Sequence, residues 1–74
     1  MSSGKGIAPG QRYRETGTTA FGTPSRVVWV VDALWHEPNG VAYVRLVNET
    51  RPTRVKTLSL VAFANPRLYV REAG

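Results

Sequence analysis

The segment from Arg26 to Asn48, RVVWVVDALWHEPNGVAYVRLVN, constrains the fold more than any other part of the sequence. Two runs rich in valine, tryptophan, tyrosine and leucine are separated by Asn39-Gly40, the dipeptide most typical of a tight hairpin turn. Both runs are too long and too β-branched for a loop, and neither has the apolar spacing of a helix. The segment therefore predicts a long β-hairpin with strands over 26–36 and 41–48.

The loop length decides which side chains of the hairpin share a face. A loop of two or four residues places odd positions of the first strand beside even positions of the second, whereas a three-residue loop breaks this relation. With the even-length loop, the face with the mixture of small and large side chains suits the interior. The inner set is Val27, Trp29, Val31, Ala33, Trp35, Ala42, Val44 and Leu46, and the outer set is Val28, Val30, Asp32, Leu34, Tyr43, Arg45 and Val47.

Three shorter alternating segments predict further strands, over 11–15, 55–60 and 67–71. In the last of these we expect Leu68 and Val70 to point inward and Tyr69 outward. The segment VAFANP, residues 61–66, is too short for an ordinary helix and ends at proline, which predicts a tight 3₁₀ turn. The glycine- and threonine-rich segment 16–25 is expected to be a loop, anchored by Phe21 in an apolar gap.

The length of 74 residues and the absence of cysteine limit how the chain is stabilised. We expect residues 1–9 to form a disordered tail and residues 10–72 to form one domain with a marginal core. No disulfide is available, and His36, the single histidine, cannot build a metal site with scattered carboxylates. We therefore expect no metal and no cofactor, and oligomerisation as the source of additional stability.

The N-terminal segment MSSGKGIAPG has no apolar stretch of the kind that a signal peptide needs, and no run is long enough for a membrane span. We expect a cytoplasmic protein without a membrane partner.

The order of the predicted elements resembles an SH3-like barrel. The resemblance is carried by PGQRYRE, VVWVVDALWHEPNGVAYVRLV, KTLSL, VAFANP and RLYVR, which cover residues 9–71. It implies an all-β, five-stranded SH3-like barrel with a short 3₁₀ turn before the last strand. The chain is most similar to small bacterial SH3-like proteins, a resemblance that implies an architecture and no activity. An OB-type barrel is the alternative, but it places a helix between the third and fourth strands, where NETRPTR predicts none.

The side chains that could perform catalysis are not arranged for it. His36 stands at the exposed end of a strand, beside a turn, with no neighbour to orient it as a general base. No glycine-rich loop precedes a helix, so a phosphate-binding loop is not predicted. We expect a protein that is not an enzyme and has no small-molecule substrate.

The excess of basic residues supports an alternative function. Ten Lys and Arg against five Asp and Glu give a formal charge of +5, which favours polyanionic partners. Since the first and last strands of such a barrel pair, their arginines and tyrosines could form one patch for a nucleic acid, with tyrosines stacking on bases. Alternating charged residues are also the usual protection of exposed sheet edges against aggregation, which is the structural explanation of the same pattern. The patch would consist of Arg12, Tyr13, Arg14, Lys56, Arg67, Tyr69 and Arg71.

The outer set of the hairpin gives the leading functional prediction. A small barrel encloses one side of its central strands, so the apolar side chains of the other side stay at the surface, relieved only by Asp32 and Arg45, which can pair across strands. Monomers seldom expose such a patch, and burying each aliphatic side chain is worth about 1.5–3 kcal/mol. We predict a binding or adaptor module that contacts a protein partner, most simply a second copy in a homodimer. The predicted interface residues are Val28, Val30, Leu34, Tyr43 and Val47.

Overall fold

The computed structural model describes residues 6–17, 21–23 and 25–72, and within these the chain is mostly β-structure. Five strands follow the alternating segments of the sequence, so the predicted order of strands is confirmed. One short helix lies between the fourth and fifth strands. The elements are β1 (Arg12–Glu15), β2 (Val28–His36), β3 (Ala42–Asn48), β4 (Val55–Ser59), α1 (Leu60–Phe63) and β5 (Tyr69–Arg71).

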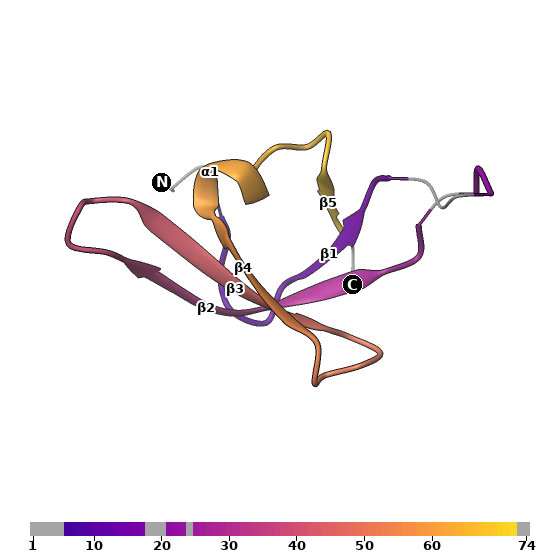
Figure 1. Ribbon diagram of the computed structural model, residues 1–74, viewed down its shortest axis with the longest axis horizontal. Helices are drawn as coiled ribbons and strands as arrows, with labels where there is room; N and C mark the ends of the chain where they lie inside the picture. The colour runs from indigo at the N-terminus through magenta and orange to yellow at the C-terminus, as the bar shows by residue number, and fades with distance from the viewer. Residues whose placement is uncertain (1–5, 18–20, 24, 73–74) are drawn as a thin grey trace.

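The strands form one antiparallel sheet in the order β4-β3-β2-β1-β5. The predicted pairing of the first and last strands is present, with Tyr13 opposite Arg71. β4 and β5 stand at the two edges, and no strand pairing joins them among the described residues. The sheet is therefore open, and the predicted closed barrel is not confirmed. Figure 1 shows the β2–β3 hairpin extending to one side, with α1 and β5 above it.

Three residues, Pro38 to Gly40, form the turn of the central hairpin. The backbone N–H of Glu37 donates to the carbonyl oxygen of Val41 at 2.9 Å, and the N–H of Gly40 donates to the carbonyl oxygen of Glu37 at 2.8 Å. Gly40 has a φ of 86°, a left-handed conformation that glycine adopts without steric cost. The turn therefore has three residues and not the expected even number. Next to a three-residue turn, odd positions of β2 lie opposite odd positions of β3, and even positions lie opposite even positions.

A β-bulge in β2 changes this pairing farther from the turn, where odd positions of β2 lie opposite even positions of β3. The register shifts between Val31 and Ala33, so that Val31 lies opposite Leu46 while Leu34 lies opposite Val44. Val44 and Leu46 are fully buried, so the side chains opposite them face the core. We call this side of the sheet the inner face and the opposite side the outer face.

The predicted placement of the residues between the bulge and the turn is therefore wrong. Leu34, expected on the outer face, packs against the core. Trp35, expected inside, lies opposite Tyr43 on the outer face with 36% of its surface exposed. Ala33, also expected inside, lies opposite Arg45. The physical reason is the extra residue of the bulge at Asp32, which turns every later side chain of β2 to the other face.

The core is small and lies between the inner face and α1. Phe63 of α1 is almost fully buried and packs edge-on against Tyr13 of β1, with ring centroids 4.5 Å apart. The ring centroid of Tyr69 lies 5.1 Å from that of Phe63, so the expected orientation of β5 is wrong: Tyr69 packs against the core. Leu68 and Val70, expected inside, are 48% and 38% exposed. The buried residues are Tyr13, Trp29, Val31, Val44, Leu46 and Phe63.

The helix α1 replaces the predicted 3₁₀ turn. It begins after Ser59, whose hydroxyl oxygen accepts a hydrogen bond from the N–H of Ala62. The N–H of Ala64 donates to the carbonyl oxygen of Leu60 at 2.9 Å, which is the spacing of an α-helix. Serine at the N-cap and the burial of Phe63 together stabilise this single turn, which the six-residue sequence window did not reveal.

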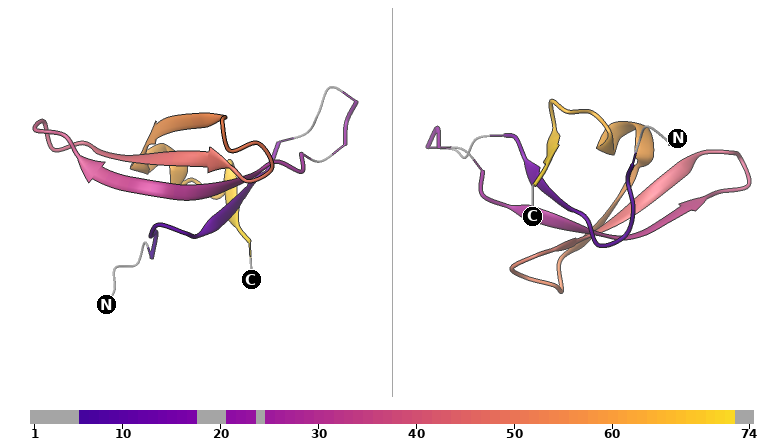
Figure 2. Two further views of the ribbon diagram at one scale, coloured as in Figure 1. Left: turned by 90° about the horizontal axis from the view of Figure 1, so that it is seen from below. Right: turned by 180° about the vertical axis from the view of Figure 1, so that it is seen from behind.

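The contacts of the folded unit begin before residue 10. Residues 1–5 of the expected tail lie outside the described residues, but Ile7 packs against the core and the N–H of Gly10 donates to the carbonyl oxygen of Val31 at 2.8 Å. At the other end of the molecule, Phe21 is 93% exposed, so the prediction that it fills an apolar gap is wrong. Figure 2 shows residues 21–23 and the turn of the β2–β3 hairpin at opposite ends of the long axis.

The bulge can be tested with the two tryptophans, which would share the inner face without it. We expect a Trp29→Phe variant, which reports on Trp35 alone, to show red-shifted emission and strong acrylamide quenching. A Trp35→Phe variant should show blue-shifted emission and weak quenching from Trp29, which is 8% exposed. Far-UV circular dichroism confirms that both variants are folded. Equal quenching of the two single tryptophans would contradict the bulge.

Candidate functional site

The outer face divides into an ion-paired half and an aromatic half. Cross-strand pairing places Val55, Val47 and Val30 in one row across β4, β3 and β2, with Arg12 of β1 at its end. Nearer the turn, Trp35 and Tyr43 lie opposite each other. The two halves differ in how much of their apolar surface the chain itself covers.

An ion pair lies across the valines of β2. Arg12 of β1 and Glu49, directly after β3, flank β2 and form a two-bond pair through the guanidinium Nε and Nη2. This contact holds the pKa of Glu49 below its ordinary value, because Arg12 donates to the charged carboxylate. Val28 and Val30, on the strand between the two partners, are half-buried. This part of the outer face is therefore partly covered within one chain.

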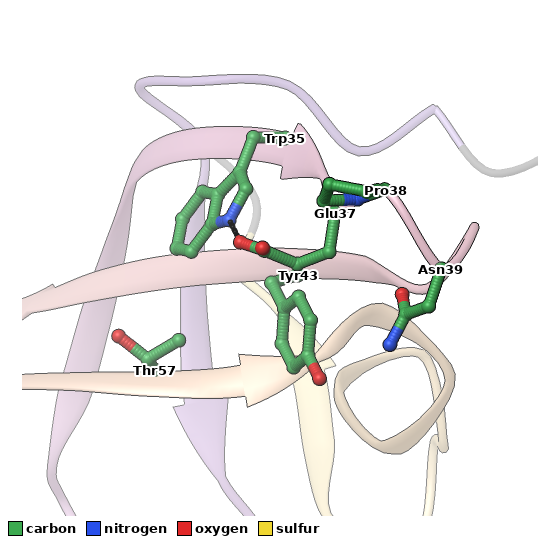
Figure 3. A pocket seen from close by; sticks show the side chains of 6 residues that line it. All are labelled: Trp35, Glu37, Pro38, Asn39, Tyr43 and Thr57. Atoms are coloured by element: carbon green, nitrogen blue, oxygen red, sulfur yellow. Dashed lines mark hydrogen bonds between the residues drawn. The ribbon is translucent and has the colours of Figure 1, made fainter.

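The other half of the outer face contains an open aromatic hollow. The rings of Trp35 and Tyr43 stack at 6.0 Å with an interplanar angle of 26°. The indole N–H of Trp35 donates to Oε2 of Glu37 at 2.7 Å, which fixes the carboxylate beside the ring (Figure 3). The hollow holds about 550 Å³, a size within the range of binding sites. We call it the aromatic hollow; its lining is Trp35, Glu37, Pro38, Asn39, Tyr43 and Thr57.

The structure places four of the predicted interface residues together. Val28, Val30, Tyr43 and Val47 lie half-buried on the outer face, whereas Leu34 faces the core. The predicted ion pair between Asp32 and Arg45 is confirmed, with 2.8 Å between Oδ2 and Nη2.

Sequence reasoning missed three exposed residues of the outer face. Trp35, Val55 and Val70 are 36%, 50% and 38% exposed, and cross-strand pairing places all three on this face. Val55 begins the predicted strand over 55–60, but its register opposite Val47 came only from the structure. Nothing in the sequence marked the bulge that turns Trp35 outward.

The predicted nucleic-acid patch is not one surface. Tyr13 is 8% exposed and Tyr69 packs against the core, so neither ring is free to stack on a base. Arg12 and Arg14 lie on the outer face, and Lys56 lies opposite the buried Leu46 on the inner face. Their separation follows from the alternation of side chains in a strand, which sends the tyrosines inward between the arginines.

The paired cations are also neutralised. Arg14 Nε lies 2.9 Å from Glu72, and Lys56 Nζ lies 3.2 Å from Glu15. Arg67 and Arg71 are exposed and form no ion pair within the described ranges, and the same holds for three further arginines. The arginines without such a partner are Arg26, Arg51, Arg54, Arg67 and Arg71, distributed over three connections and β5.

Lys56 bridges the two edges of the open sheet. Its Nζ lies 4.4 Å from the ring centroid of Trp29 and 5.2 Å from that of Tyr69, and it donates to Glu15, which also accepts from the Trp29 indole. Burial by itself lowers the pKa of Lys56, but the interactions with Tyr69 and Glu15 outweigh it and hold the pKa above its ordinary value. The cation thus connects β4 to β1, β2 and β5 without a strand ladder.

No group of three or more histidine or acidic side chains within the described residues is placed to hold a metal ion. In the same part of the chain, the structure contains no helix with the length and apolar character needed to cross a bilayer. No protein-family model, curated protein or solved structure matches this chain.

A Lys56→Met variant tests the bridge, because it keeps an unbranched side chain over Trp29 and removes the charge. We expect the free energy of unfolding to fall by about 1 kcal/mol at neutral pH, measured by urea denaturation. Arg54→Met is the matched control, since Arg54 is exposed and unpaired in the described structure, and it should change stability little. An unchanged Lys56→Met stability would mean that the cation does not connect the edges.

The raised pKa of Lys56 also gives a pH dependence. A lysine with a higher pKa in the folded state stabilises that state fully below the unfolded value of 10.5, and this stabilisation is lost as the pH rises through the folded value. The stability difference between wild type and Lys56→Met should therefore be constant at neutral pH and shrink above about pH 10.5. A difference that grows in alkaline solution would contradict the assigned direction.

Proposed function

We propose that this chain is a small non-catalytic protein-binding module whose partner contacts the outer face of the β2–β3 hairpin. The observation that carries the proposal is the aromatic hollow, where Trp35 and Tyr43 are stacked at the surface and tied to Glu37. Tryptophan and tyrosine are the residues most enriched in binding hot spots, because they offer large rigid surfaces at low entropic cost. Val55 and Val47 extend the apolar surface towards β4.

The ion-paired half of the face suits the rim of such an interface. Arg12–Glu49 and Asp32–Arg45 are satisfied within the chain, so a partner does not need to neutralise them. A central apolar contact surrounded by satisfied polar groups is the usual anatomy of an interface. We accordingly place the aromatic hollow at the centre and the ion pairs at the margin.

We also propose the finer architecture, an SH3-like arrangement. Its support is the strand order, the long connection between β1 and β2, and the short helix before β5. Lys56 bridges the interval between the edge strands with side-chain contacts in place of a ladder.

A displayed library of random peptides tests the binding function. We expect wild-type protein to enrich peptides that a Trp35→Ala variant does not retain, with at least about tenfold weaker binding to the variant, because hot-spot aromatics contribute 2 kcal/mol or more. Val61→Ala is the matched control, since Val61 is 86% exposed on α1 and does not line the hollow, and it should retain the peptides. Thermal unfolding verifies that each variant is folded.

A measurement of self-association distinguishes a second copy of the chain from another partner. Sedimentation equilibrium of the wild type and Trp35→Ala identifies a second copy as the partner if only the wild type self-associates. Failure of the wild type to enrich any peptide over Trp35→Ala, together with a strict monomer at high concentration, would falsify the proposed function.

Nucleic-acid binding is the second proposal, supported by the arginines without carboxylate partners. If it holds, replacing Arg51 and Arg54 by glutamine should weaken binding of a single-stranded oligonucleotide, and binding by the wild type should fall steeply with salt. Arg12→Gln is the control, because Arg12 is already paired with Glu49. Absence of salt-sensitive binding by the wild type at low ionic strength would remove this proposal.

A further inference from the structure

Glu37 is distinct among the acidic residues of the chain. The sequence has five acidic residues, and all of them lie in the described ranges. Four take part in ion pairs with Arg12, Arg14, Arg45 and Lys56. Glu37 forms no ion pair within the described residues, although the protein carries a formal charge of +5. It is also the acidic residue that lines the aromatic hollow.

The cation on the adjoining row of the sheet is not available to Glu37. Arg45 lies on the outer face, one row from Tyr43, and its guanidinium is held by Asp32 at 2.8 Å. The hydrogen bond from the Trp35 indole uses Oε2 of Glu37, and within the described residues Oε1 accepts no hydrogen bond. A carboxylate accepts several hydrogen bonds, so Glu37 retains capacity towards the open side of the hollow.

We propose that the aromatic hollow binds an arginine side chain of the partner protein. A guanidinium is planar, stacks on an indole or phenol ring, and donates a fork of N–H groups to a carboxylate. The hollow offers both acceptor types in contact, a stacked ring pair and a carboxylate fixed to one of the rings. Lysine satisfies the charge but not the planar stacking, and an acidic side chain meets the repulsion of Glu37.

This inference rests on the proposed function, since it names the partner chemistry at the same face. It adds a requirement that hydrophobic contact alone does not have: binding must depend on the charge of Glu37 as well as on the ring of Trp35. Removal of the Trp35 ring therefore tests the binding function, and removal of the Glu37 charge tests the arginine site.

The test uses a glycine-serine pentapeptide with arginine at its centre, and the same peptide with citrulline or lysine there. Citrulline has nearly the shape of arginine without the charge. Binding is followed by NMR through the indole N–H resonance of Trp35 at millimolar peptide. We expect the arginine peptide to bind about fivefold or more tightly than the citrulline peptide, with the lysine peptide between them.

The matched variants are Glu37→Gln and Glu49→Gln, which remove the same charge from the same face. Glu37→Gln keeps an acceptor for the Trp35 indole and should lose the preference for arginine over citrulline. Glu49→Gln should keep it, because Glu49 lies against Arg12 and not in the hollow.

Three results of the pentapeptide measurements overturn the inference: no shift of the Trp35 resonance by the arginine peptide, equal binding of the arginine and citrulline peptides, or an unchanged preference in Glu37→Gln. If the peptide library is enriched through Trp35 with sequences that lack arginine, the binding function stands and the arginine site fails. If the library yields nothing and the wild type is a strict monomer at high concentration, the binding function itself fails.

Discussion

The bulge in β2 is the constraint on which the candidate site depends. Next to a three-residue turn, odd residues of β2 lie on the same face as odd residues of β3. The core, however, needs odd residues of β2, such as Trp29 and Val31, on the same face as Val44 and Leu46. Both demands cannot hold along a regular ladder, because side chains alternate with a period of two. One extra residue at Asp32 reconciles them, and the same adjustment turns Trp35 outward to stack on Tyr43. The aromatic hollow is therefore a consequence of how the hairpin closes.

The charges of the chain act mainly on its own structure. Lys56 joins the edges of the open sheet through Trp29, Tyr69 and Glu15, on the inner side where a small domain has little apolar volume to spare. Of the three further ion pairs, one connects the neighbouring strands β2 and β3, and the other two connect β1 to the residues directly after β3 and β5. A basic composition thus coexists with carboxylates that are nearly all engaged, and this makes the unpaired Glu37 beside two aromatic rings chemically distinctive.

The two halves of the outer face show why apolar content alone does not locate an interface. Val28 and Val30 are as apolar as the sequence suggested, yet they are half-buried within one chain, on the strand between Arg12 and Glu49. Trp35 is 36% exposed, although its sequence position predicted burial. Amphipathic side chains such as arginine can shield aliphatic surface while keeping their charge in water. The exposed apolar side chains of the outer face accordingly include Trp35 near the turn, and Val55 and Val70 on the two edge strands.

The sequence by itself determined the five strands, the antiparallel central hairpin and the Asp32–Arg45 pair, because these follow from local alternation, turn chemistry and strand adjacency. The pairing of the first and last strands was expected from the resemblance to an SH3-like barrel. Only the tertiary structure decided the open sheet, the helical turn before β5, the inward positions of Leu34 and Tyr69, and the outward position of Trp35. Turn length and bulge position are set by competition between distant residues for the core, centred on Val44, Leu46 and Phe63, and no local window of sequence contains that competition.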